Sequence, residues 1–184
     1  MSNSFLDIYI TTLEKWSGLK FGKILYDSNV DGKSDDVFKD KIINHSHLYF
    51  IVVDSDDNIF GHYHNKTIDG IGYDIYDNDI FLFTLDSNGR DNENKFERKK
   101  TVCTHLYDNG FYFCGNIGYD AGYYSVLTIG GADSRVHEDI SHFFDVDDPT
   151  VFTGTCYSFG YDNFYEPKRV IVIEMKNEWK WKWL

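Results

Sequence analysis

The most regular set of oxygen ligands in the sequence is a short run of acidic and amide side chains, Asp27, Asn29, Asp31 and Asp35. Their spacing, with a glycine at the sixth position, matches the first nine positions of an EF-hand loop, in which alternate oxygens surround Ca²⁺. Position twelve should supply a bidentate glutamate, but Phe38 stands there, and the residues before Asp27 have the pattern of a strand. We therefore expect a polar turn that also caps the following helix, and a Ca²⁺-responsive regulator using these four residues is the alternative.

Two further pairs of side chains could bind a metal or undergo redox chemistry. His62 and His64 alternate within one expected strand, so both rings point to the same face, but zinc would need a third ligand from elsewhere. Cys103 and Cys114 lie on the facing strands of a hairpin expected around Asn109-Gly110. We favour structural histidines and two buried thiols, with a zinc site and a redox pair as the alternatives.

Signatures of nucleophilic and phosphate chemistry are absent from the sequence. It contains neither a Gly-x-Ser-x-Gly elbow nor a Gly-x-x-x-x-Gly-Lys loop. We therefore expect a protein that is not an enzyme and needs no cofactor. A hydrolase is the alternative, with its acidic residues in the stretch from Asp133 to Asp148, which would then have to line a deep pocket.

The charge balance argues against nucleic acid as a partner. The net charge is −12, from 18 basic and 30 acidic residues, and Arg135 is the only basic side chain between Thr101 and Pro167. Such a surface repels phosphate backbones. A DNA-binding regulator is the least favoured alternative, because it would need the few cations to cluster in space, among them Lys99, Lys100, Lys168 and Arg169.

Cysteine usage and hydropathy indicate the compartment. The three cysteines are an odd number without close spacing, no apolar leader follows Met1, and no apolar stretch approaches the roughly 18 residues of a membrane span. We expect a cytoplasmic protein, with a nuclear one as the alternative, and neither secretion nor a transmembrane segment.

Hydrophobic periodicity predicts two helices followed by eight or nine strands. Apolar residues recur at helical spacing over Ser4–Ser17, and Ser34 caps a second helix to about Asn44. A short helix is also expected between Asp133 and Phe144. The expected strands are residues 21–26, 47–53, 59–64, 80–85, 101–107, 111–117, 123–129, 151–159 and 169–175. The expected core consists of Ile24, Phe38, Phe50, Val52, Phe81, Phe83, Val126, Phe152, Val170 and Val172.

This order of elements predicts a mainly β fold with flanking helices (α+β), an antiparallel two-sheet β-sandwich. We expect residues 1–18 to form an N-terminal helix packed on the domain, residues 19–176 to form the domain, and residues 177–184 a Trp/Lys-rich C-terminal tail. Aromatic and cationic residues alternate at period two along Trp179–Leu184. An added edge strand or a frayed terminus is the simpler interpretation, and a partner-docking segment is the alternative.

The order of several segments resembles that of a TLDc domain. Phe21–Gly32, followed by a helix containing Phe38, resembles the opening strand, polar turn and helix of that family. His47–Val53 with Asn58–Gly61 resembles its next hairpin. The phenylalanine-rich Ile80–Leu85 resembles its "FLFSL" strand, and Phe152–Phe159 with Val170–Met175 resembles the closing "LAGSYNF" and final strand. The resemblance covers roughly Trp16 to Lys176 and departs in the middle, where Gly118–Gly122 and Gly130-Gly131 replace a glycine-rich segment.

The resemblance implies a β-sandwich with flanking helices and no established catalytic centre. Related proteins protect cells against oxidative stress, and several bind the vacuolar proton-pumping ATPase. The expected function is therefore that of a non-enzymatic protein-interaction module of stress-response type. Its expected partner is a protein, with subunits of the vacuolar ATPase as candidates, and the chain itself is expected to be a monomer or a weak oligomer.

Overall fold

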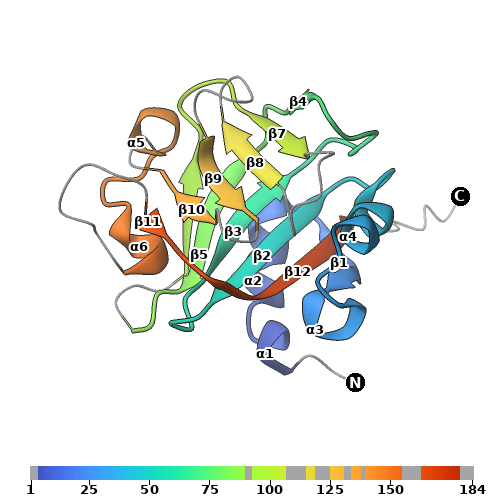
Figure 1. The fold of residues 1–184 in the computed structure, drawn as a ribbon, viewed down its shortest axis with the longest axis horizontal. Coiled ribbons are helices and arrows are strands. Elements are labelled where there is room, and N and C mark those ends of the chain that lie inside the picture. Colours follow the sequence, from blue (N-terminus) through green and yellow to red (C-terminus); the bar gives the residue numbers. More distant parts are fainter. Residues whose placement is uncertain are drawn as a thin grey trace, which may run out of the picture.

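The structure is a computed structural model that describes residues 4–89, 93–106, 115–118, 125–130, 134–137, 140–154 and 163–178. Its strands form two six-stranded antiparallel sheets that stack face to face (Figure 1). The first sheet contains, in spatial order, β1 (Lys20–Asp27), β12 (Pro167–Lys176), β2 (Leu48–Asp54), β3 (Ile59–His64), β5 (Phe81–Asp86) and β6 (Asn94–Glu97). The second sheet contains β11 (Asn163–Phe164), β10 (Arg135–Val136), β9 (Ser125–Ile129), β8 (Gly115–Gly118), β7 (Cys103–Leu106) and β4 (Asp74–Tyr76).

Short helices cover the ends and the outer face of this sandwich. They are α1 (Ser4–Asp7), α2 (Ile10–Ser17), α3 (Ser28–Asp31), α4 (Asp35–Ile42), α5 (Ile140–Phe143) and α6 (Thr150–Thr153). In Figure 1, α2 lies behind the first sheet, on the face that points away from the second sheet. Within the described residues, none of these helices has the length and hydropathy that crossing a membrane requires.

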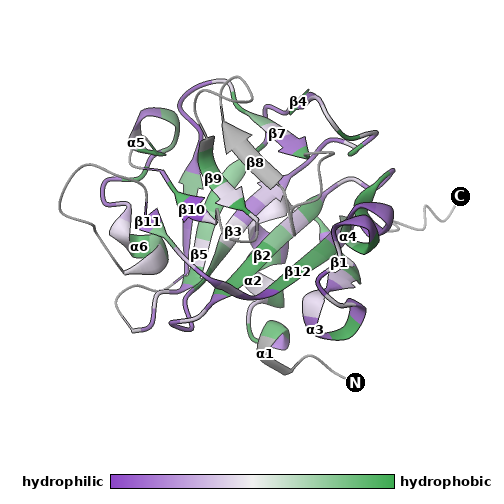
Figure 2. Cartoon of the chain, viewed as in Figure 1, coloured by the Kyte–Doolittle hydropathy of each residue, from purple (hydrophilic) through white to green (hydrophobic). Residues whose placement is uncertain are grey.

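Both faces of the first sheet are buried. One face packs against the second sheet and α4 in a core that includes Phe50, Phe60 and Val172. The opposite face packs against α1 and α2 in a separate cluster that includes Tyr49 and Ile171. The central strands consequently carry apolar side chains at consecutive positions rather than alternate ones, as Figure 2 shows for β2 and β12.

The mainly β, two-sheet fold predicted from the sequence is confirmed, and so is a short helix between Asp133 and Phe144, which is α5. Nine of the ten residues expected in the core are buried, and Ile24 is half-buried against the outer cluster. The strands β3 and β5 match their predicted ranges within one residue.

Several predicted elements are wrong in detail. The strand expected at 151–159 begins instead as the helix α6, closed by Gly154 at φ 72°, and residues 155–159 lie outside the described part. The polar turn after Asp27 contains the short helix α3, and the first expected helix is interrupted between α1 and α2. The short strands β4, β6, β10 and β11 were not predicted, and the hairpin turn at Asn109-Gly110 lies outside the described residues.

The register of the first sheet brings several strand ends together. Tyr63, near the end of β3, faces Phe81 at the start of β5, and Phe81 faces Glu97 at the end of β6. The strand β12 ends at Lys176 on the same side, because the start of β2 lies between β12 and the end of β3. Side chains from distant parts of the sequence therefore meet at this end of the sheet.

The middle of β3 tolerates no side chain at Gly61. A Cβ atom added there would lie 1.8 Å from the backbone oxygen of Phe50 and 3.1 Å from the ring of Phe83. We expect Gly61→Ala to lower the free energy of unfolding by about 2 kcal/mol or more, because an overpacked core must shift its backbone. Urea denaturation measures this change.

The matched control is Gly89→Ala. An added Cβ there would meet no atom within 4 Å, so only the positive φ of 76° is strained. An equal loss in the two variants would contradict the steric explanation at Gly61.

Candidate functional site

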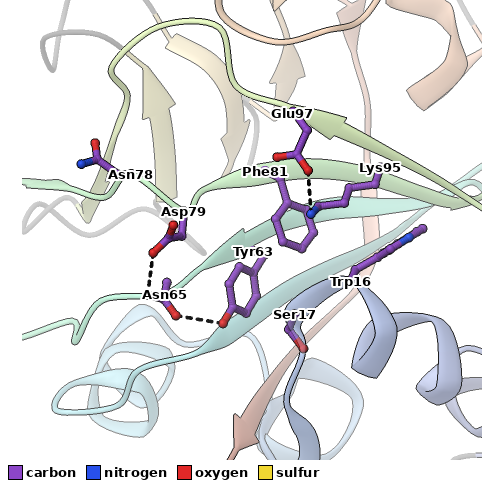
Figure 3. A pocket seen from close by; sticks show the side chains of 9 residues that line it. All are labelled: Trp16, Ser17, Tyr63, Asn65, Asn78, Asp79, Phe81, Lys95 and Glu97. Carbon is purple, nitrogen blue, oxygen red and sulfur yellow. Dashed lines mark hydrogen bonds and ion pairs between the residues drawn. The ribbon is translucent and has the colours of Figure 1, made fainter.

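The described surface has a hollow at the end of the first sheet where the strands β3, β5 and β6 meet the end of α2 (Figure 3). Its volume is about 280 Å³. It is lined by Trp16, Ser17, Tyr63, Asn65, Asn78, Asp79, Phe81, Lys95 and Glu97. We call it the strand-end hollow.

Stacked aromatic rings form the base of the strand-end hollow. The Tyr63 and Phe81 rings stack with centroids 4.9 Å apart, and both residues are 3% exposed. Trp16 meets Phe81 edge to face at 6.5 Å, and the Lys95 ammonium lies 4.3 Å from the Phe81 centroid. These contacts fix the base, because each ring is held by at least one other.

The Tyr63 hydroxyl is a neutral donor in this base. Burial, followed by the charges of Asp77 and Asp79, raises the pKa of Tyr63 above its ordinary value. The hydroxyl donates to Oδ1 of Asn65 at 3.1 Å. The phenol therefore orients the Asn65 side chain rather than acting as a base.

The rim of the hollow is polar and acidic. Nδ2 of Asn65 donates to Oδ2 of Asp79 at 3.0 Å, and Nζ of Lys95 lies 2.7 Å from Oε1 of Glu97. Figure 3 shows Trp16 and Ser17 on one side of the hollow, and Asp79 and Glu97 across from them. Exposed carboxylates that face an indole across a hollow can bind a cationic side chain between them.

The loop that carries Asp79 is fixed by the buried carboxylate of Asp77. Oδ2 of Asp77 accepts from the backbone N–H groups of Asn65 and Lys66, and Oδ1 accepts from that of Asp79 at 2.9 Å. The rim is therefore preorganised, although no sequence motif marks it. The three aspartates at positions 74, 77 and 79 are the signal in the sequence that could have pointed to it.

Three of the four candidate Ca²⁺ ligands are paired with cationic side chains of the chain itself. The buried Asp27 receives two hydrogen bonds from Arg169, one of them 2.9 Å from Nε to Oδ1. Its Oδ1 also accepts from the backbone N–H of Asn29 at 3.1 Å, so Asp27 caps α3. The guanidinium of Arg169 thus pairs with the carboxylate at the first position of the candidate calcium loop.

The other two carboxylates of the loop are also paired with lysines. Oδ1 of Asp31 lies 2.9 Å from Nζ of Lys41, and Oδ2 of Asp35 lies 2.5 Å from Nζ of Lys39. Among the described residues, no three histidine, cysteine or acidic side chains come together as possible metal ligands. The loop is a turn in which Asp27 caps α3, whereas Ser34, the expected cap of the following helix, makes no side-chain capping hydrogen bond to α4 among the described residues.

His62 and His64 both point into the core between the sheets. The His62 ring stacks on Phe50 at 4.5 Å, and neither of its ring nitrogens has a hydrogen-bond partner among the described residues. Nδ1 of His64 is 3.0 Å from the Thr104 hydroxyl. Cys103 is a buried thiol on β7, whereas Cys114 lies outside the described residues.

The residues considered for a hydrolase site and for DNA binding form ion pairs and hydrogen bonds on the surface. In the acidic stretch, Asp145 lies 3.5 Å from Lys99, and Asp148 accepts from the backbone N–H of Thr150. Lys168 pairs with Asp57 at 2.8 Å, near the β2–β3 turn. That turn is at the opposite end of the first sheet from Lys99, so the cations considered for DNA binding do not gather on one surface.

The pair between Asp27 and Arg169 yields a prediction about stability. Removing the guanidinium in Arg169→Leu leaves the carboxylate buried and uncompensated, so we expect the free energy of unfolding to fall by about 3 kcal/mol. Lys168→Leu removes an exposed pair on the neighbouring residue and should leave stability nearly unchanged. Equal urea midpoints for the two variants would contradict the structural role given to Arg169.

The buried histidines yield a prediction about pH. Burial lowers the pKa of His64 to about 4 and that of His62 well below its ordinary value. In the unfolded chain both titrate near about 6.5, so the unfolded state binds more protons as the pH falls below that value. The free energy of unfolding should therefore decrease from about pH 6.5 towards pH 4, by up to about 1.4 kcal/mol per pH unit for each histidine.

His62→Phe keeps the ring stack on Phe50 and should make this dependence shallower. His142→Gln, at an exposed position of α5, should leave it unchanged. Denaturation series between pH 7 and pH 4.5 measure the slopes, and identical slopes for the His62 variant and the parent would contradict the assignment.

Comparison with known proteins identifies the family of the chain. A search of curated proteins finds no match to the chain. The family model for the TLDc domain matches residues 3–175, which extend from before α1 almost to the end of β12. The chain therefore belongs to the TLDc domain family.

Proposed function

We propose that this chain is a non-enzymatic protein-interaction module of the oxidative-stress response, and that it docks its partner at the strand-end hollow. The observation that carries this proposal is the preorganised acidic rim above a packed aromatic base. The volume of about 280 Å³ is just below the range of about 300–1,000 Å³ that is usual for small-molecule pockets. A hollow of this size accommodates one or two side chains of a protein partner.

The lining residues define the chemistry of that partner. The carboxylates of Asp79 and Glu97 attract lysine or arginine, and the half-buried indole of Trp16 offers a ring for stacking or for a cation. Aromatic and arginine anchors contribute most of the binding energy in protein interfaces. We therefore propose a partner segment that combines cationic and aromatic side chains.

The polar groups of the hollow support binding rather than catalysis. The Ser17 hydroxyl donates to the backbone oxygen of Leu13 at 2.9 Å, and Asp79 and Glu97 each have a partner on the rim. None of the lining residues pairs a nucleophile with a general base in the way that covalent catalysis requires.

Membership of the TLDc family suggests the identity of the partner. Subunits of the vacuolar proton-pumping ATPase are the proposed target, and the cytoplasm, where such subunits would be reached, is the proposed location. The nucleus is the alternative compartment.

Affinity purification of the chain from its own cells, with and without peroxide, tests this function. We expect mass spectrometry to identify vacuolar ATPase subunits. The double charge reversal Asp79→Lys with Glu97→Lys should reduce their recovery by about tenfold or more, because like charges across an interface oppose binding.

Asp40→Lys with Asp56→Lys is the matched control. Both of these residues are exposed, and the change in net charge is the same. Equal recovery with the two double variants would show that the hollow is not the docking surface. Failure to recover any ATPase subunit with the parent chain would exclude the proposed partner.

A further inference from the structure

We propose that the Trp/Lys segment of this chain, residues 179–184, docks into the strand-end hollow of the same molecule and so competes with the partner. This inference rests on the proposed function, because it names a regulator of the same docking surface. Residues 179–184 lie outside the described part, so the argument uses their sequence and the place where the described chain stops.

The segment leaves the domain beside the hollow. The strand β12 ends at Lys176, which is paired with Lys20 at the start of β1. Glu178 follows two residues after Lys176, and its charge is a minor cause of the raised pKa of Lys20, after the bond of Lys20 to Glu14. Only two residues separate Lys20 from Ser17, which lines the hollow. The described chain thus stops two residues beyond the end of β12, on the side of the sheet where the hollow opens.

The segment is long enough to cross the hollow. From β12, the strands β2, β3 and β5 follow in order, so three strand spacings of about 4.8 Å separate the end of β12 from the start of β5, about 14 Å in all. Residues 177–184 in an extended conformation span about 26 Å. The segment can therefore reach Phe81 and Glu97 without disturbing β12.

The alternation of the segment matches the two walls of the hollow. Successive side chains of an extended chain point in opposite directions, so Trp179, Trp181 and Trp183 share one side and Lys180 and Lys182 share the other. The hollow has Trp16 and Ser17 on one wall and Asp79 and Glu97 on the other (Figure 3). A segment lying between these walls places an indole against Trp16 and an ammonium group against the carboxylates.

Charge favours the same arrangement. Trp179–Leu184 carries two lysines and no acidic side chain, in a chain whose net charge is −12. Lys95 already pairs with Glu97. Among the described residues the Asp79 carboxylate accepts from the neutral amide of Asn65, so Asp79 is the better partner for an incoming lysine. Because the segment is tethered, its effective concentration is about millimolar, so even weak docking is populated.

Removal of the segment makes a direct test possible. The variant that ends at Glu178 retains every described helix and strand, since β12 ends at Lys176. It also retains Trp16 as its single tryptophan of the four. In the ¹⁵N-labelled truncated variant, the one indole N–H signal therefore reports on the wall of the hollow.

We expect the Trp16 indole signal to shift between the truncated variant and the full chain. An unlabelled peptide of residues 177–184 should move the signal of the truncated variant towards its position in the full chain. The same peptide should bind the full chain about tenfold more weakly or worse, because the tethered copy competes. A Trp16 signal that is unaffected by truncation and by the peptide would overturn the inference.

Two controls define the contact. Asp79→Lys with Glu97→Lys in the truncated variant should weaken peptide binding by about tenfold, whereas Asp40→Lys with Asp56→Lys should not change it. A peptide of the same eight residues in the order Asn-Glu-Lys-Lys-Trp-Trp-Trp-Leu should bind less tightly, because it lacks the alternation. Equal binding of the two peptides would overturn the two-wall arrangement.

Sedimentation distinguishes docking within one molecule from docking between copies. We expect the full chain to sediment as a monomer, and a dimer that disappears on truncation would overturn the intramolecular arrangement in favour of a second copy.

Partner recovery separates this inference from the proposed function. If truncation shifts Trp16 but no ATPase subunit is ever recovered, the inference stands and the proposed partner fails. If the subunits are recovered equally with and without the segment, the inference fails and the proposed function stands.

Discussion

The first sheet carries apolar side chains on both of its faces, so each face needs a cover of its own. The second sheet and α4 cover one face, and α1 and α2 cover the other. Consecutive residues of β2 belong to different layers: Phe50 points to the face covered by the second sheet, and Tyr49 points to the opposite face, covered by the N-terminal helices. The N-terminal helices are thus part of the core and not an attachment to it.

The strand-end hollow originates where this outer cover stops. The helix α2 ends at Ser17, closed by Gly18 at φ 72°, before it reaches the last residues of β3 and β6. Rings that would otherwise be covered, such as Phe81, are protected there by Lys95 and by the loop that Asp77 holds. Where α2 no longer covers the sheet, polar side chains surround the exposed edge. They form a hydrated rim, and the aromatic rings stay buried at the base of the hollow.

Much of the fold could be predicted from the sequence, but the hollow could not. Long strands such as β3 were evident because their apolar runs are bounded by turn residues, whereas β4 and β6 are short and polar and exist only through pairing with a neighbour. Val151 and Phe152 favour a strand by propensity, yet Gly154 closes them into one helical turn. The hollow joins Trp16 to Glu97 through the register of strands that are distant in sequence, which periodicity alone does not encode.

The position of β12 has a consequence for biosynthesis. This strand is the last of the described strands in sequence, yet it lies inside the first sheet, between β1 and β2. Among the described strands β1 pairs only with β12, so β1 cannot join the sheet before β12 has been synthesised. During translation β2, β3, β5 and β6 can pair in the order in which they are made, whereas the edge of β2 stays open until β12 has been synthesised. Newly made chains should depend on chaperones at that stage, long before any partner is met.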